Sequence, residues 1–187
     1  NISFTYCNES IRWYNNISLK LPMNSDANVI LHSRCGGGNG FLFFKKLVLY
    51  GNIKNIIKKK INSLKENYLC IQVRNTDRKC DYKNLYKKNI HYINSFHQIY
   101  LCTDDKLVYE FFKSKFPNVL CFTRFPENQY RNLHRSDISP AIKMEDLLTD
   151  IFIAANSKSI LSNSKGGFIT LLRNCHKNKK IVLNMLS

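Results

Sequence analysis

Short apolar runs alternate along this chain with longer segments in which apolar residues recur every three or four positions. Four runs have the length and composition of buried strands: 69–74, 98–102, 119–123 and 159–161. Four segments have the spacing of amphipathic helices: 52–64, 82–94, 104–116 and 144–156. Regular alternation of strands and helices predicts an α/β fold, a Rossmann-like parallel sheet with helices on both faces.

The two ends of the chain carry weaker patterns. We expect a strand at 27–32, a glycine-rich turn at 35–40, a short helix at 166–174 and a last strand at 180–183. Residues 1–26 show no regular pattern. Because the chain begins at Asn1 rather than at Met, we expect it to be part of a longer protein.

Residues that could bind an anion follow two of the predicted strands. In open α/β sheets, ligands bind outside the carboxyl ends of the strands. Arg74 ends the first strand, and the planar guanidinium of an arginine suits a diphosphate. After the last strand of the pattern, Ser164, Gly166 and Gly167 open a helix, where backbone N–H groups are free to bind phosphate. Lys165 adds positive charge to this turn.

Composition narrows the class of ligand. The chain has 29 Lys and Arg against 13 Asp and Glu, a formal net charge of +16, which favours anionic partners. A basic nucleic-acid-binding module is one alternative, but the lysines are dispersed and no recognised binding motif occurs, so we expect no nucleic acid as a partner.

The seven cysteines include no C-x-x-C pair, so we expect neither a metal site nor a disulfide framework. This use of cysteine favours a reducing compartment. We expect no membrane span, since no apolar run is long enough.

Several segments, in the same order and at similar spacing, resemble the α1,6-fucosyltransferases, a family that includes nodulation fucosyltransferases. Residues 72–78 (QVRNTDR) resemble the family's H-x-R-R-T-D-K segment, and residues 99–105 (IYLCTDD) resemble its YLATDD strand and turn. Residues 144–152 resemble its next helix. Residues 159–172 resemble the strand, serine-rich turn and helix that close the donor site, and residues 41–64 resemble the segment between the family's two domains.

The resemblance implies a glycosyltransferase of the GT-B type, with two Rossmann-like domains and the donor between them. Residues 1–40 would be the tail of a mostly missing first domain and the crossing between domains. Residues 41–187 would be the nucleotide-sugar-binding domain. The implied reaction is a metal-independent, inverting transfer of fucose from GDP-fucose to a glycan or glycoprotein acceptor. It implies no cofactor, because GDP-fucose is the donor substrate.

The resemblance also implies roles for individual residues. Arg74 falls on the arginine that holds the β-phosphate, and Asp150 falls on the aspartate that reads the guanine. Gln72 falls on the histidine that assists this aspartate. The serine of the phosphate turn falls on residues 164–166. In the implied mechanism, Arg74 and the amides of this turn stabilise the negative charge that grows on the departing GDP.

The chain departs from the family at two positions that bear on catalysis. Asn75 stands in place of a second arginine, and Tyr82 stands at the position of the glutamate base. The neighbouring Asp81 is our candidate for the base that takes a proton from the acceptor hydroxyl. Asp77 is a further candidate catalytic carboxylate, although a role in holding its loop is favoured. An alternative is therefore a domain that binds GDP-sugars without catalysis.

Each candidate also has a purely structural interpretation. In that interpretation, Arg74 forms a surface ion pair with Asp77, and Asp150 is a solvated charge on its helix. The acidic pair at 104–105 is better explained as a helix cap than as a catalytic pair. The glycines at 36–40 follow a predicted strand, as a phosphate-binding loop would, but an interdomain hinge is favoured.

Overall fold

The computed structural model describes residues 40–76, 79–128, 133 and 136–187. The described residues contain a four-stranded sheet in which all strands are parallel. The strands are β1 (Leu69–Val73), β2 (Ile99–Thr103), β3 (Val119–Leu120) and β4 (Ser159–Leu161), in the order β3-β2-β1-β4. The four strands predicted for this part of the chain are confirmed, although β3 is shorter than expected.

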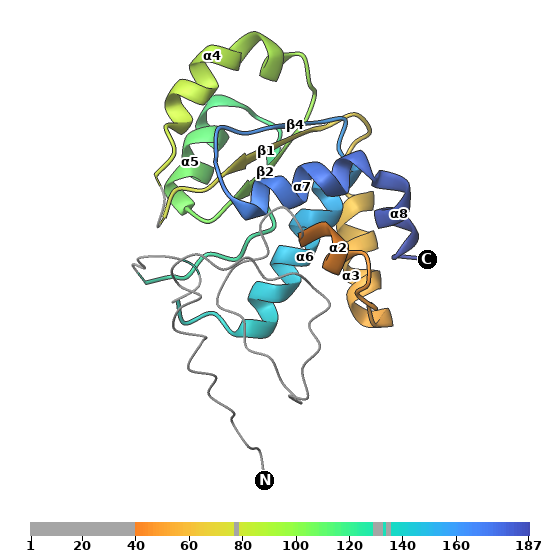
Figure 1. Cartoon of the computed structure of the whole chain (residues 1–187). Coiled ribbons are helices and arrows are strands. Elements are labelled where there is room, and N and C mark those ends of the chain that lie inside the picture. Colours follow the sequence, from red (N-terminus) through yellow and green to blue (C-terminus); the bar gives the residue numbers. More distant parts are fainter. Residues whose placement is uncertain (1–39, 77–78, 129–132, 134–135) are drawn as a thin grey trace, which may run out of the picture. The chain divides into compact units, whose positions relative to one another are not determined.

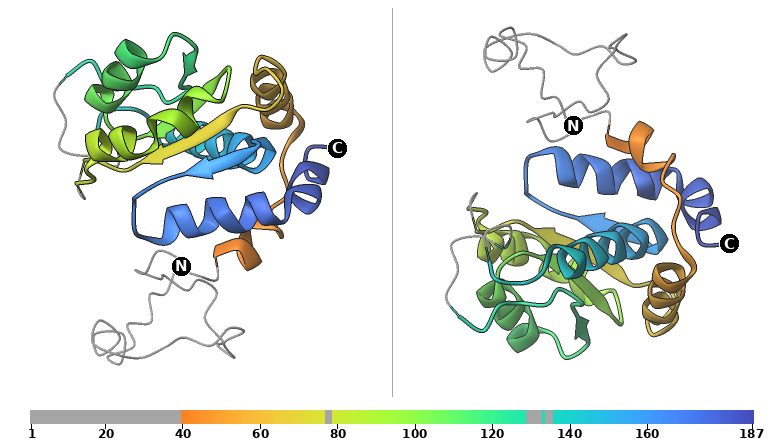
Figure 2. Two further views of the ribbon diagram at one scale, coloured as in Figure 1. Left: turned by 90° about the horizontal axis from the view of Figure 1, so that it is seen from above. Right: turned by 90° about the horizontal axis from the view of Figure 1, so that it is seen from below.

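Helices cover both faces of the sheet. They are α2 (Gly40–Phe44), α3 (Gly51–Asn62), α4 (Tyr82–Asn94), α5 (Lys106–Lys115), α6 (Pro140–Asn156), α7 (Gly167–Lys177) and α8 (Lys179–Asn184). Figure 1 shows α4 and α5 on one side of the sheet and α3, α6 and α7 on the other, and the two views of Figure 2 show the same layers. The predicted α/β fold, a parallel sheet with helices on both faces, is confirmed.

The side chains of β1 alternate between two hydrophobic cores. Leu69, Ile71 and Val73 pack in a core shared with α4 and α5. Cys70 packs in the other core, to which α3, α6, α7 and α8 contribute. Every residue of β1 and β2 is buried. Burial on both faces explains why these strands are unbroken apolar runs in the sequence.

Side-chain caps mark the starts of three helices. Asp81 caps α4, Asp105 caps α5 and Ser139 caps α6, each by accepting a backbone N–H of the first turn. These N–H groups have no partner inside the helix, so the caps stabilise the helix starts. Pro140, which follows Ser139, suits the first helical position. The Ser-Pro pair explains why α6 begins there and not at Met144, as predicted.

The prediction of a last strand at 180–183 is wrong, because these residues lie in α8. Val182 and Leu186, four positions apart, are buried, whereas Ile181 is half exposed. This spacing of buried residues is typical of a helix. A run of only four apolar residues does not distinguish a short strand from a helical turn.

Residues 1–39 lie outside the described part of the chain. The predicted strand at 27–32 and most of the glycine-rich turn at 35–40 lie there too. The described residues belong to one compact unit. The division of the chain at residue 40 into two domains stays a prediction.

Candidate functional site

The carboxyl ends of β1 and β4 lie side by side where the chain changes direction across the sheet. From β1 the chain continues to β2 and β3 on one side, and β4 is then added on the other side of β1. The loop after β1 leads to α4, and the loop after β4 leads to α7, which packs on the opposite face. Ligand crevices of α/β sheets form at such points. We call residues 72–76, 79–81 and 162–167 the switch-point edge.

A chain of hydrogen bonds joins the two strands at the switch-point edge. The backbone N–H of Arg74 donates to Ser164 Oγ at 3.1 Å. The N–H of Ser164 donates to Ser162 Oγ at 3.0 Å, and that hydroxyl donates to Gln72 Oε1 at 2.8 Å. Gln72 is only 3% exposed and Ser164 only 8%. The structure therefore brings together the predicted site residues Gln72, Arg74 and Ser164.

The turn after Ser164 leads into the N-terminus of α7. Gly166 has φ 149° and ψ −179°, a conformation that residues with a Cβ rarely adopt. Lys165 and Gly166 are exposed, and Gly167 is the first residue of α7. The first N–H groups of a helix lack intrahelical partners and carry partial positive charge. This turn is thus an exposed and positively polarised segment next to the end of β1.

The loop that follows β1 returns to the switch-point edge. Cys80 Sγ lies 3.2 Å from Ser164 Oγ. The backbone carbonyl of Asp81 accepts a hydrogen bond from Asn163 Nδ2 at 2.9 Å. The Asp81 side chain is exposed and caps α4. Its role as a base stays a prediction, and the other candidate carboxylate, Asp77, lies outside the described residues.

Asn75 holds this loop against the end of β2. Its N–H donates to Asp104 Oδ1 at 2.8 Å, and its Nδ2 donates to Asp105 Oδ2 at 2.7 Å. Its Oδ1 accepts the N–H of Cys80 at 3.2 Å. Thr76 Oγ1 donates to Asp104 Oδ2 at 2.6 Å. We call these four contacts the Asn75 latch. The helix-cap interpretation is confirmed for Asp105, whose other oxygen accepts the backbone N–H of the second residue of α5.

Asp150 lies on the face of the sheet that α6 covers. It is 7% exposed, and its two carboxylate oxygens accept hydrogen bonds from the Tyr100 hydroxyl and from Cys102 Sγ. The interpretation of Asp150 as a solvated charge is therefore wrong. Burial raises the pKa of Asp150 from 3.8 to about 7, and the two hydrogen bonds oppose this rise. The expected contact between Asp150 and a guanine stays a prediction.

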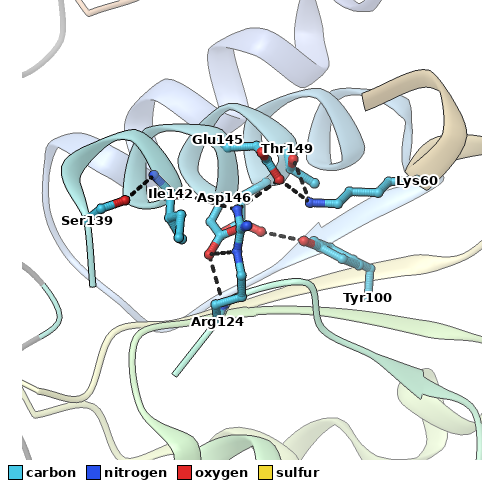
Figure 3. A network of polar contacts seen from close by, with 9 residues as sticks. Lys60, Tyr100, Arg124, Ser139, Ile142, Glu145, Asp146 and Thr149 are labelled. Atoms are coloured by element: carbon cyan, nitrogen blue, oxygen red, sulfur yellow. Dashed lines mark hydrogen bonds and ion pairs between the residues drawn. The ribbon is translucent and has the colours of Figure 1, made fainter. Parts of the chain in front are cut away.

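A second polar network, shown in Figure 3, joins the segment after β3 to α6. Arg124 donates to Asp146 from its backbone N–H at 2.9 Å and from its guanidinium at 2.7 Å. The same guanidinium donates to Glu145 at 2.8 Å, and Lys60 of α3 donates to Glu145 at 3.2 Å. Asp146 is 4% exposed. The network anchors the start of the loop that connects β3 to α6, and sequence reasoning missed it because Arg124 and Asp146 are 22 positions apart.

A hollow of about 810 Å³ lies at the opposite edge of the sheet, next to the residues that precede β1 and β4. Its basic lining residues are Lys65, Lys158, His176 and Lys179. Helices α3, α6 and α7 end near these residues. Basic side chains at helix C-termini are explained by the negative end of the helix dipole. The charge of this hollow therefore does not indicate an anion site.

The described residues contain neither a candidate metal site nor a helix that could span a membrane. Within 40–76, 79–128, 133 and 136–187, no group of three or more His, Cys, Asp or Glu side chains is placed to hold a metal ion. In the same ranges, no helix has both the length and the apolar character needed to cross a membrane. The cysteines described there are free thiols: Cys70, Cys80, Cys102, Cys121 and Cys175.

Comparison with known proteins gives one similar solved structure. No protein-family profile matches the chain, and no curated protein sequence matches it. The chain is similar in structure to the α-1,6-fucosyltransferase NodZ, which was crystallised and soaked with GDP-fucose. The TM-score is 0.49 and the sequence identity is 16%, over 71% of this chain. The match covers 44% of the NodZ chain, so this chain spans less than half of that enzyme.

Proposed function

We propose that the chain carries the donor-binding part of a glycosyltransferase and that the donor is GDP-fucose. The observation that carries the proposal is the hydrogen bond from the Arg74 N–H to Ser164 Oγ, between the ends of β1 and β4. It brings the strand end that bears the arginine next to the turn that opens α7. A pyrophosphate group is the ligand that such a pair of positive groups suits.

The charges at the switch-point edge favour a diphosphate over a neutral ligand. Arg74 and Lys165 are cationic, and the first amides of α7 add partial positive charge. Asp81 supplies one carboxylate at the same edge. The carboxylates of Asp104 and Asp105 accept hydrogen bonds from Asn75, as part of the Asn75 latch. With Lys79, the three cationic side chains equal the three carboxylates in formal charge, so the preference for a diphosphate rests on Arg74, Lys165 and the first amides of α7.

The choice of fucose and of guanine rests on the resemblance to the α1,6-fucosyltransferases. The resembling segments, which include residues 72–78, 99–105 and 159–172, contain the ends of three neighbouring strands of one sheet. In the proposed enzyme, this sheet is the donor half of a GT-B arrangement. The resemblance assigns guanine recognition to Gln72 and Asp150, although both are buried and hydrogen-bonded within the chain, and it assigns the diphosphate to residues 164–167.

The proposed reaction is a single displacement with inversion at the anomeric carbon. Asp81 takes the proton of an acceptor hydroxyl while the hydroxyl oxygen attacks the sugar. The bond from the sugar to GDP breaks, and Arg74 and the turn amides stabilise the negative charge on the leaving diphosphate. Asp77 is the second candidate for the carboxylate. No metal enters this step, because the arginine, the lysine and the helix amides supply the positive charge.

A binding screen tests the donor. Isothermal titration of the protein with GDP, GDP-fucose, GDP-mannose and UDP-glucose should show binding of GDP and GDP-fucose and weaker binding of the uridine nucleotide. Binding of RNA with a steep salt dependence, without binding of GDP, would support the nucleic-acid-binding alternative. Binding of GDP without hydrolysis or transfer of GDP-fucose would support the non-catalytic alternative.

Substitution of Arg74 tests the site. Arg74→Ala should lower the rate of fucose transfer about a hundredfold, since one lost contact to the departing charge costs roughly 3 kcal/mol. The control is Lys115→Ala, which removes one positive charge at the far end of α5. Both variants should keep the thermal unfolding midpoint of the original chain. Equal transfer rates in Arg74→Ala and in the control would refute the site.

A further inference from the structure

The two residues that follow β1 are anchored to opposite neighbours in the sheet. The N–H of Arg74 donates to Ser164, after β4. The N–H of the next residue, Asn75, donates to Asp104, after β2. Successive amides of an extended chain point in opposite directions, so the two anchors do not compete. The chain that leaves β1 is therefore held from both sides at the point where the proposed diphosphate site begins.

The side chain of Asn75 uses both ends of its amide. It is buried, its Nδ2 donates to Asp105, and its Oδ1 accepts the N–H of Cys80. Of the side chains of this size, only an asparagine offers a strong donor and a strong acceptor in such an arrangement. An aspartate here would lose the donor and would add a third negative charge beside Asp104 and Asp105. The residue type is therefore matched to its surroundings.

The bond to Cys80 closes the loop after β1. It joins positions that are five residues apart. Beyond it, Cys80 Sγ lies 3.2 Å from Ser164 Oγ, and the carbonyl of Asp81 is held by Asn163. The Asn75 latch thus fixes the chain on both sides of the loop, at Asn75 and at Cys80, next to Arg74 and Asp81, which contact the segment that follows β4.

We infer that Asn75 is a positioning residue that sets the diphosphate-binding geometry of the switch-point edge. It acts through the loop, since its amide contacts Asp105 and Cys80 rather than a ligand. The consequence for nucleotide binding rests on the proposed function, whereas the positioning of the loop does not.

The first experiment compares nucleotides with and without a β-phosphate. Asn75→Ala should raise the Kd for GDP about tenfold, as expected for the loss of a buried hydrogen-bond partner, and should change the Kd for GMP little. The matched control is Asn118→Ala, because Asn118 Nδ2 also joins two loops, by donating to the carbonyl of His97 at 3.1 Å next to the start of β3. Equal shifts for GDP and GMP, or equal shifts in both variants, would overturn the inference.

The second experiment needs no nucleotide. The rate at which iodoacetamide alkylates Cys80, followed by mass spectrometry, should rise several-fold in Asn75→Ala and stay unchanged in Asn118→Ala. An unchanged Cys80 rate would overturn the positioning role, whatever the nucleotides do. If the original chain binds no GDP, the proposed function fails, and the Cys80 rates still decide whether the latch positions the loop.

A milder variant covers the case in which Asn75→Ala does not fold. Thr76→Val removes the hydrogen bond to Asp104 Oδ2 and keeps the shape of the side chain. It should move the GDP Kd and the Cys80 alkylation rate in the same direction by a smaller factor. Values equal to those of the original chain in both measurements would count against the latch.

Discussion

Two carboxylates of α6 are buried, and they have partners of different kinds. Asp146 pairs with the guanidinium of Arg124. Asp150 accepts hydrogen bonds from the hydroxyl of Tyr100 and the thiol of Cys102, which are uncharged donors. A buried carboxylate with uncharged donors is costly to ionise, and this cost raises the pKa of Asp150 to about 7.

The raised pKa of Asp150 predicts a pH dependence of stability. The folded chain keeps the proton up to about pH 7, whereas the unfolded chain releases it near 3.8. Between these values the folded state binds more protons, so the free energy of unfolding falls as pH rises from about 4 to about 7. Each unit of pKa difference corresponds to about 1.4 kcal/mol.

Asp150→Asn removes this titration and keeps an oxygen that can accept from Tyr100. Urea unfolding at several pH values should show a flatter slope for Asp150→Asn than for the original chain across this window. The other residues are the same in both proteins, so the difference between the two curves isolates Asp150. Two parallel curves would show that Asp150 is not the titrating group.

The residues of the switch-point edge were predictable to different degrees. Gln72 and Arg74 lie at the end of one predicted strand and Ser164 follows another, and in a parallel sheet the ends of neighbouring strands meet at one edge. The Asn75 latch was not predictable, because its bonds to the end of β2 join positions 29 and 30 residues apart. No periodicity in the sequence marks such pairs. The burial of Asp150 was equally hidden, since a charged residue is usually exposed.

Among the elements, α6 is tied to its surroundings by charge as well as by apolar packing. Its buried residues include Asp146, Thr149 and Asp150 besides an apolar stretch at 151–155. Lys60 reaches Glu145 and Thr149 from α3, and its ammonium lies 5.5 Å from the centre of the Phe122 ring. Two segments that are distant in sequence, α3 and the stretch after β3, therefore meet at the first half of this helix (Figure 3).

A pair of substitutions on α6 separates the buried ion pair from the exposed one. Asp146→Asn should lower the free energy of unfolding by about 1–3 kcal/mol, because Asp146 is nearly buried and accepts charged hydrogen bonds from Arg124. Glu145→Gln should cost roughly 0–1 kcal/mol, since its ion pairs with Arg124 and Lys60 are more exposed. Thermal and urea unfolding measure both. Equal losses would contradict the assigned importance of Asp146.

The strands were easier to predict than the terminal helix. Strands buried on both faces are unbroken apolar runs, and β1, β2 and β4 begin within one residue of the predicted starts. The segment at 180–183 is also an apolar run, but it is short and has no strand neighbour among the described residues. Only its packing against the core through Val182 identifies it as helical.

At the scale of the whole molecule, the net charge of +16 attracts any anion. A protein that neutralises six to ten phosphates loses about 10³-fold or more in affinity between 50 and 200 mM salt. The proposed binding of GDP at the switch-point edge involves a few groups, and its Kd should rise less than about tenfold over the same range. Fluorescence titrations with GDP and with a single-stranded RNA should show this difference. A GDP affinity as salt-sensitive as RNA binding would indicate nonspecific attraction to the surface.

The order of the strands also sets the order in which the site is assembled during synthesis. The strands β1, β2 and β3 follow one another along the chain, whereas the bond between Arg74 and Ser164 joins residues 90 positions apart. On the ribosome, three strands of the sheet are complete while β4 is still untranslated. Until β4 pairs with β1, one edge of β1 has unpaired backbone N–H and C=O groups, to which another extended chain can bind. The pairing of β4 with β1 both completes the sheet and brings Arg74 next to Ser164, so the proposed nucleotide site exists only once this edge is covered.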